Sequence, residues 1–338
     1  MKNNTFTRRY SAGAALLSAM LTVTLVATFA AAALWQQWRS VEVEIAERGR
    51  LQVAWLLIGS LDWARIILKI DGNTDADPRT KPEPSDHFNE PWATPLEESR
   101  LSTFLAADKN NTGGLTAEEQ VDAFLSGSMV DAQSKLNVFN LIDENGNISK
   151  QDFLTFKKLY AHLNLPEDEL ESFVANLKAT LASSSVITTA LKPQRVRQLN
   201  WLGLSPQSLD KLTPYITLLP IRTTVNINTA PAEVILASVP KLNFAEAKST
   251  VSSRSASNFT SIADAEKKVP ALAGNLDISQ HSVATQFFEV TGRIRLEEIV
   301  IETKSLIDRR NIRNVKTLWR ERAVVAAPET NANSSIQP

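Results

Sequence analysis

The chain of 338 residues contains no cysteine, which excludes a disulfide framework, thiolate catalysis and cysteine-ligated zinc together. Histidine is scarce as well. His87, His162 and His281 are scattered along the chain, and none shows the pairing with a nucleophile that covalent catalysis needs. No Walker loop, GxSxG or HExxH motif occurs. The sequence therefore predicts that the protein is not an enzyme.

An excess of charge of either sign is also missing. The 36 Lys and Arg residues face 37 Asp and Glu residues, so the net charge is −1, and the sequence pI is about 6.4. A surface that attracts nucleic acid by its field carries a basic excess. We therefore expect no nucleic-acid partner.

One long apolar run is present, at the N-terminus. Nothing in residues 14–34 is charged, and a helix of about 20 apolar residues crosses the hydrocarbon core of a bilayer. Lys2, Arg8 and Arg9 precede the run, and such basic residues hold an N-terminus on the cytoplasmic side. We expect one membrane-spanning helix, with the rest of the chain across the membrane.

Three export devices fit this N-terminus. A prepilin-type leader is short and basic, ends in glycine and precedes a membrane helix that the mature protein keeps. Gly13 followed by Ala14 has this form, because a Cβ just before the cut would obstruct the protease. A secretory signal peptide would instead be cut near Ala30–Ala33, and a plain signal anchor would not be cut.

The helical pattern continues beyond the apolar run. We expect one helix over residues 14–70, about 85 Å long at 1.5 Å per residue. A break at Gly59 and Ser60, into an anchor and a separate helix, is the alternative. Five apolar residues recur at spacings that place them on one face of this helix: Val53, Leu57, Leu61, Ala64 and Leu68.

In the rest of the chain, the spacing of apolar residues and the positions of turn-forming residues predict the secondary structure. Proline and acidic residues predict a loop over 72–95, and the pattern over 96–121 is helical. Residues 127–140 read as a strand followed by a turn, and 150–273 as short helices separated by prolines. After Ser282 the period becomes two, which predicts a meander of antiparallel strands.

Four motifs follow the membrane helix, before the closing meander: Leu61-Asp62-Trp63, Asp131-Ala132-Gln133, Leu136-Asn137-Val138-Phe139-Asn140-Leu141 and Val225-Asn226-Ile227-Asn228-Thr229-Ala230. In this order, they resemble the minor pseudopilin K family of type II secretion systems. The resemblance implies an α+β fold: a pilin-like antiparallel sheet packed on the long N-terminal helix, with a large all-helical insertion between its strands.

The resemblance also implies a place and a role. It implies cleavage between Gly13 and Ala14 by prepilin peptidase, methylation of the new N-terminus, and assembly with other minor pseudopilins and the inner-membrane secretion platform. The protein would be needed for pseudopilus assembly and for export of folded proteins across the outer membrane. The expected order is a leader (1–13), a transmembrane segment (14–34), the periplasmic half of the helix (35–70), a loop with the first part of the core (71–137), the inserted helical domain (138–281), the strand meander (282–325) and a disordered tail (326–338).

Ser18 supports a position at the filament tip. Most pilin-like proteins carry a Glu five residues after the cut, where its charge meets the N-terminal amine of a neighbouring subunit. Burying a carboxylate in lipid without a partner is costly. A subunit with no subunit above it therefore has no use for the Glu.

Residues 224–272 raise a rival interpretation. They resemble the helix-hairpin-helix unit of DNA-binding competence proteins, in which a glycine-bearing hairpin directs backbone N–H groups at phosphate. The corresponding hairpin, Pro240–Phe244, has no glycine. We expect a structural module here; the alternative is a membrane-tethered helix-hairpin-helix protein that binds nucleic acid.

Two acidic loops offer candidate calcium ligands. In the first loop, Asp108, Asn110 and Glu119 occupy positions one, three and twelve of an EF-hand loop. In the second, Asp143 and Asn145 begin a loop that is two residues too short. The resemblance adds weight, since K-type pseudopilins are associated with calcium in the helical domain. No cofactor is required, and ordinary polar turns are the alternative.

Overall fold

The computed structural model describes residues 11–75, 84–100, 123–182, 191–296 and 299–326. Met1–Ile58 form one compact unit and Gly59–Pro338 a second. The second unit contains the main sheet and the helical insertion. Besides these, it has six described 3₁₀ helices: η1 (Pro91–Ala93), η2 (Ala132–Ser134), η3 (Val138–Leu141), η4 (Val196–Leu202), η5 (Pro270–Leu272) and η6 (Ile312–Asn314).

The N-terminal helix α1 runs from Ser11 to Asp75 without interruption. Its most apolar stretch of 18 residues has a mean hydropathy of 2.0, so α1 can cross a membrane by length and composition. Gly59 lies inside the helix, and nothing comes within 4 Å of the position of its missing Cβ. The prediction of one helix through Gly59 is confirmed, since no proline removes a helical hydrogen bond there.

Five antiparallel strands form the main sheet in the order β1-β2-β7-β8-β9. The three C-terminal strands confirm the predicted meander. The helix predicted over 96–121 is wrong at its start, because Leu96–Arg100 pairs with β2 as an edge strand and this pairing overrides local helix propensity. Residues 101–122 lie outside the described part. The strands are β1 (Leu96–Arg100), β2 (Ala123–Asp131), β7 (Phe287–Leu296), β8 (Ile299–Asp308) and β9 (Lys316–Ala326).

The last part of α1 packs on one face of this sheet. Leu61, Ala64 and Leu68, spaced three and four residues apart, form a buried cluster with side chains of the sheet. Trp92 closes the cluster, with its ring edge-on to Phe288 at a centroid distance of 5.1 Å. All five residues of the predicted stripe, Val53 and Leu57 included, are buried.

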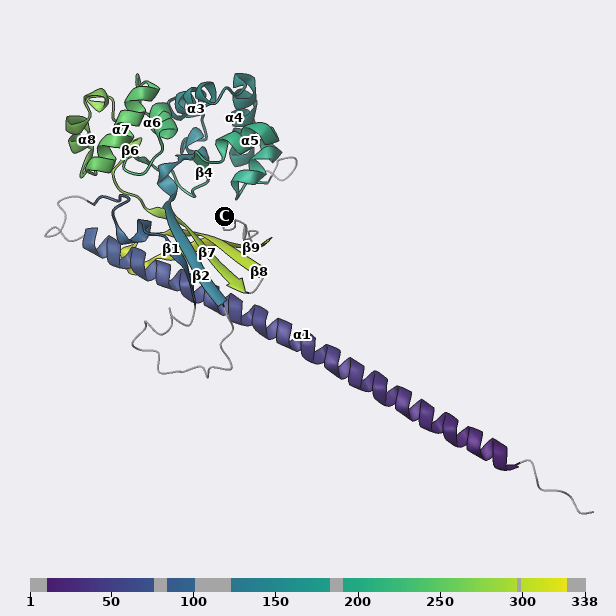
Figure 1. The fold of residues 1–338 in the computed structure, drawn as a ribbon. Coiled ribbons are helices and arrows are strands. Elements are labelled where there is room, and N and C mark those ends of the chain that lie inside the picture. The colour runs from purple at the N-terminus through teal and green to yellow at the C-terminus, as the bar shows by residue number, and fades with distance from the viewer. Residues whose placement is uncertain (1–10, 76–83, 101–122, 183–190, 297–298, 327–338) are drawn as a thin grey trace, which may run out of the picture. The chain divides into compact units, whose positions relative to one another are not determined.

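Between β2 and β7 the chain builds a helical domain. Figure 1 shows its helices gathered in one group, which the chain enters from β2 and leaves into β7. Two short parallel pairs join β3 (Leu136–Asn137) to β4 (Ile216–Thr217) and β5 (Val225–Asn226) to β6 (His281–Ser282). The helices are α3 (Lys150–His162), α4 (Glu167–Ala182), α5 (Pro206–Leu212), α6 (Ala232–Ser238), α7 (Phe244–Ala256) and α8 (Ile262–Lys268).

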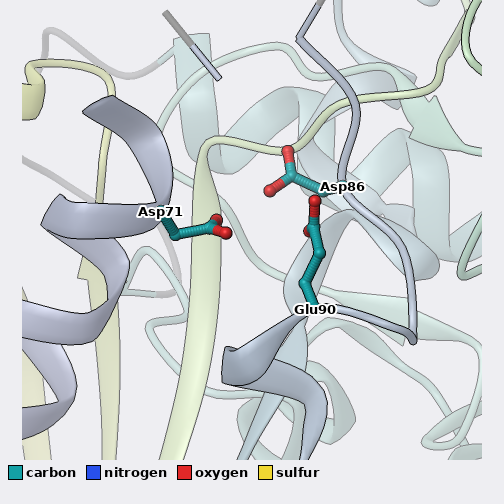
Figure 2. A group of neighbouring side chains, drawn as sticks. All are labelled: Asp71, Asp86 and Glu90. Atoms are coloured by element: carbon teal, nitrogen blue, oxygen red, sulfur yellow. The ribbon is translucent and has the colours of Figure 1, made fainter. Parts of the chain in front are cut away.

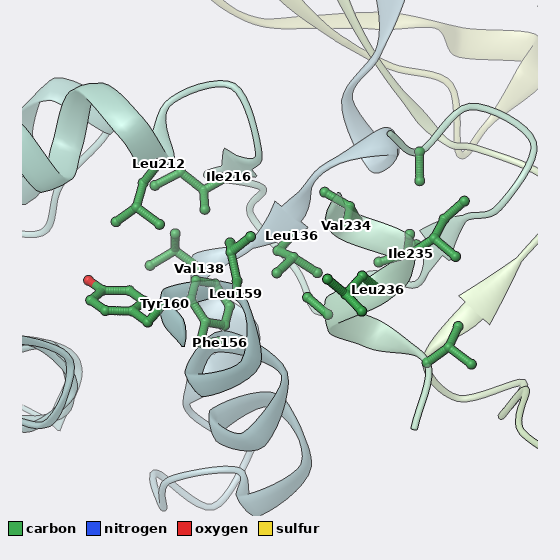
Figure 3. Close-up of a cluster of buried hydrophobic side chains, with 14 of the residues drawn as sticks. Leu136, Val138, Phe156, Leu159, Tyr160, Leu212, Ile216, Val234, Ile235 and Leu236 are labelled. Atoms are coloured by element: carbon green, nitrogen blue, oxygen red, sulfur yellow. The ribbon is translucent and has the colours of Figure 1, made fainter. Parts of the chain in front are cut away.

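This domain has a hydrophobic core of its own, part of which is drawn in Figure 3. Phe156, Leu159 and Tyr160 project from one face of α3 into it, at the spacing of a helical stripe. Leu136 belongs to the same core, so the chain joins the helical domain directly after β2 ends at Asp131, ahead of residue 138.

Candidate functional site

The chain leaves the main sheet at Asp131 and returns to it at Phe287. We call the segment that follows Asp131 the outgoing arm and the segment that leads into Phe287 the returning arm. Buried polar side chains gather where these two arms meet. We call this group the polar joint. Each member is at most 9 % exposed, which is unusual for charged residues unless they are paired. The polar joint consists of Asp71, Asp86, Glu90, Asp131, Asn226, Thr229, Thr285 and Arg309.

Asp131 fixes the outgoing arm. Its carboxylate accepts hydrogen bonds from the backbone N–H of Gln133 at 2.7 Å, the Asn226 amide at 2.8 Å and the Thr229 hydroxyl at 2.6 Å. All three donors are neutral. Burial therefore dominates and raises the pKa of Asp131, although these hydrogen bonds oppose the shift.

The asparagines of the family motif bond to backbone that lies outside regular structure. The Asn228 side chain donates to the Phe259 carbonyl at 2.8 Å and accepts from the Phe259 N–H at 2.9 Å. Asn140 does the same with the backbone of Thr223, at 2.7 and 3.1 Å. Buried backbone groups need such partners. These two motif residues therefore hold segments of the helical domain together by hydrogen bonds.

Arg309 fixes the returning arm and the end of α1. One guanidinium nitrogen donates to Asp71 at 2.6 Å, and another donates to Asp86 and, at 3.0 Å, to the Thr285 carbonyl. The guanidinium carbon lies 4.6 Å from the centre of the Phe288 ring, a cation–π contact. One buried arginine thus connects α1, the loop before η1 and the arm that leads into β7.

Figure 2 shows Asp71, from the end of α1, pointing toward Asp86 and Glu90, which both lie in the loop before η1. Oxygens of the three carboxylates lie within 4.8 Å of one another, close enough to share a metal ion. The Arg309 guanidinium already bonds to two of them and supplies the positive charge that a metal would supply. Burial raises the pKa of Asp86 to about 7, against the opposing attraction of Arg309.

The predicted cleavage and calcium residues lie apart from the polar joint. Gly13 and Ala14 lie in the first turn of α1. Asp143 and Asn145 share a tight turn, where one Asp143 oxygen accepts from the N–H groups of Asn145 at 2.9 Å and Asn147 at 2.8 Å. The first calcium loop, with Asp108, Asn110 and Glu119, falls outside the described residues.

The fit of calcium to the Asp143 turn is incomplete. Calcium takes six to eight oxygen ligands, and one Asp143 oxygen is already bonded to backbone. Asp152, in the first turn of α3 after this loop, is paired with Arg222. The turn therefore closes through its own hydrogen bonds.

The hairpin between α6 and α7 is fixed by hydrogen bonds to other parts of the helical domain. Lys158 of α3 donates to the carbonyls of Val239 and Leu242, at 2.9 and 3.1 Å. Asn243 and Glu246 form a capping box at the start of α7. These contacts anchor the hairpin to α3 and to the start of α7, with Leu242 buried.

A long N-terminal helix on an antiparallel sheet, with a domain inserted between two strands, defines a pilin-like class. Comparison with known proteins agrees. The model of the family "Type II secretion system (T2SS), protein K" matches residues 225–285, the segment that holds Asn226 and Asn228 and that raised the helix-hairpin-helix interpretation. The type II secretion system protein K of Pseudomonas aeruginosa is 23 % identical over 309 residues, covering 86 % of each chain.

A solved structure shares the fold. A chain in the crystal structure of the GspK-GspI-GspJ complex from the type 2 secretion system of enterotoxigenic Escherichia coli aligns with a TM-score of 0.61 at 18 % identity. The alignment covers 82 % of this chain and 98 % of that one. The chain thus has a pilin-like fold. It is similar to protein K of type II secretion systems.

The sequence analysis did not identify the contacts of Arg309 with Asp71 and Asp86. Arg309 is 238 residues from Asp71 and 223 from Asp86 along the chain, so no local pattern links them. The asparagine motifs were found, but only as a family signature. Their one local signal was an unusual density of Asn and Thr between apolar residues.

Proposed function

We propose that this protein is the minor pseudopilin at the tip of the type II secretion pseudopilus, needed for assembly of the pseudopilus and for export of folded proteins across the outer membrane. The observation that carries the proposal is the domain α3–α8, inserted between the neighbouring strands β2 and β7. Subunits in the body of a pilin-like filament stack with a rise far smaller than a globular domain. An insertion of this size would collide with a subunit placed above it.

Ser18 supports the same position. Its hydroxyl donates to the Ala15 carbonyl at 2.9 Å, within its own helix. A side chain satisfied in this way needs no partner in the membrane, whereas a carboxylate would need the amine of a neighbouring subunit. Nothing at this position therefore favours docking beneath another subunit.

The side of α1 that faces away from the sheet is suited to partner subunits. Trp63, Ile66 and Ile70 are 48, 52 and 61 % exposed, and exposed apolar patches of this kind mark protein–protein interfaces. A separate groove of about 380 Å³ lies between α1 and the strands β2 and β7; Trp63 is among its lining residues, and none of them is charged. The E. coli relative was solved in a complex with GspI and GspJ, which supports two other minor pseudopilins as the partners here.

The same proposal covers maturation and location. Prepilin peptidase would cut after Gly13, the new N-terminus would be methylated, and α1 would hold the protein in the inner membrane beside the secretion platform, with its bulk in the periplasm. The apolar stretch of α1 supports a single membrane pass. The basic residues ahead of it support a cytoplasmic N-terminus.

Analytical ultracentrifugation of the full chain in detergent, alone and with two other minor pseudopilins, tests the proposal. We expect a monomer alone and a complex with one copy of each partner. Ile70→Asp should weaken the complex at least tenfold. Leu154→Asp, which changes an equally exposed residue (60 %) on α3, should leave it intact.

Two results would contradict the proposal. A homopolymer of this chain would place it in the filament body. Tight, salt-sensitive binding to DNA would favour the helix-hairpin-helix alternative.

A further inference from the structure

Strand β9 is an open edge of the main sheet. It pairs with β8 on one side, and the part of the chain that the structure describes supplies no strand on the other. The strand is 11 residues long and contains no proline. Four consecutive residues in it are exposed: Arg320, Glu321, Arg322 and Ala323. A long, open edge presents backbone N–H and C=O groups to which a strand of another chain can be added.

Two arginines of β9 share the face of the sheet that packs on α1. Side chains alternate between the two faces of a strand, and residues paired directly across strands share a face. Val290 of β7 belongs to the cluster with α1; it pairs with Ser305 of β8, which pairs in turn with Arg320. Thr303 pairs in the same way with Arg322. The two guanidinium groups therefore lie on one face, two residues apart.

The positive charge of these two arginines is not neutralised on this face. Their partners across β8, Ser305 and Thr303, are uncharged. Both hydroxyls are buried without a hydrogen-bond partner, so the guanidinium groups do not bond to them. The carboxylate of Asp62 on α1 is paired with Arg65. Within the described part of the chain, neither β9 arginine forms an ion pair, and both remain available to a partner.

The opposite face of β9 has an ion pair of its own. Glu321 accepts a hydrogen bond from Arg195 of the helical domain at 3.2 Å, and it pairs in register with Lys304. The Arg195 guanidinium carbon also lies 3.9 Å from the centre of the Trp319 ring, a cation–π contact. Charges of both signs meet on this face. The unmatched positive charge of β9 is therefore confined to the face that packs on α1.

This charge selects among the strands that could pair with the edge. Opposite charges directly across two strands stabilise the pairing, and like charges destabilise it. A second copy of β9 would bring arginine toward arginine. A strand with a carboxylate at every second position would place each carboxylate beside a guanidinium, and arginine binds carboxylates with two parallel hydrogen bonds. The edge is therefore suited to an acidic strand from another protein.

We propose that the β9 edge binds an acidic extended segment of another protein, which adds to the main sheet as a further strand and pairs its alternating carboxylates with Arg320 and Arg322. This surface differs from the outer side of α1 that is assigned to partner subunits above. The proposal does not depend on the position of the protein in a filament, and it goes beyond the assembly role.

Peptide binding to the full chain in a nonionic detergent tests the proposal. The probe is a synthetic peptide with Glu at every second position and Val or Thr between, and the matched control peptide has Gln in place of each Glu. We expect the Glu peptide to bind about tenfold more tightly or better, with a difference that shrinks at high salt. Hydrogen–deuterium exchange over Lys316–Ala326 should slow on binding, because an added strand protects the N–H groups of the edge.

Substitutions at the two arginines complete the test. The double variant Arg320→Gln/Arg322→Gln should bind the Glu peptide no more tightly than the Gln peptide. Arg197→Gln, which removes an exposed arginine of η4, is the matched control and should bind as the wild type does. All three positions are exposed, so the variants should fold normally. No binding, equal binding of the two peptides, binding that persists in the double variant, or binding without protection of β9 would overturn the proposal.

Discussion

The side-chain amide of Asn226 donates to the carboxylate of Asp131 at 2.8 Å, across 95 residues of sequence. Asp131 is the last residue of β2, and Asn226 belongs to β5 in the helical insertion. The bond therefore ties the inserted domain to the strand from which it departs. It also gives a physical role to a motif that sequence alone identified only as a family signature.

Replacing Asn226 by alanine should destabilise the protein. The change leaves the buried Asp131 carboxylate short of a donor, and an unsatisfied buried polar group costs about 1–3 kcal/mol. Urea unfolding of the chain without its apolar segment measures the loss. Asn200→Ala, at an exposed asparagine, is the control and should change stability by less than about 0.5 kcal/mol. Equal effects of both variants would show that the Asp131 bond adds nothing.

Two residues on α1 should separate stability from assembly. Leu68 is fully buried against the sheet (0 % exposed), so Leu68→Ala should cost about 2–5 kcal/mol of unfolding free energy. Ile70 is 61 % exposed, so Ile70→Ala should change stability little and weaken the complex with partner pseudopilins. Thermal melts and pull-down assays on the same two variants distinguish these outcomes. A stability loss for Ile70→Ala as large as that for Leu68→Ala would remove the basis for assigning the outer side of α1 to partners.

Maturation at Gly13 stays a prediction. We expect protein extracted from membranes to begin at Ala14 with a methylated amine, and Gly13→Val to block processing without blocking membrane insertion, because a Cβ would obstruct the protease. N-terminal sequencing and mass spectrometry measure both. A mature start near Ala31 would indicate a cleaved signal peptide and contradict the pilin-like maturation.

Calcium at the acidic loops also stays a prediction. If either loop binds calcium, chelation should lower the melting temperature, since a ligand at 100 times its Kd stabilises the native state by about 2.7 kcal/mol. Asp108→Ala and Asp143→Ala, made separately, would show which loop is responsible. The Asp143 turn is already closed by backbone donors, so we expect the smaller effect there. A melt unchanged by chelator in the wild type would leave both loops as ordinary turns.

Periodicity predicted the regular elements well where one face of an element is buried. The stripe at Leu61, Ala64 and Leu68 and the alternation after Ser282 both follow from burial of one side, and both predictions are confirmed. The strand Leu96–Arg100 was missed because its residues are mostly exposed and its character comes from pairing with β2. An edge strand of this kind leaves no hydrophobic pattern to detect.

The sequence by itself determined the long apolar N-terminal helix, the strand meander and the absence of cysteine chemistry, since each depends on composition or on the spacing of neighbouring residues. Only the tertiary structure decided the polar joint. Asp71, Asp86, Asp131 and Arg309 come from four distant segments, and each looks like an ordinary surface residue in its own sequence context. Burial and charge pairing arise only when those segments meet, and these two effects shift the pKa values of Asp86, Asp131 and Arg309.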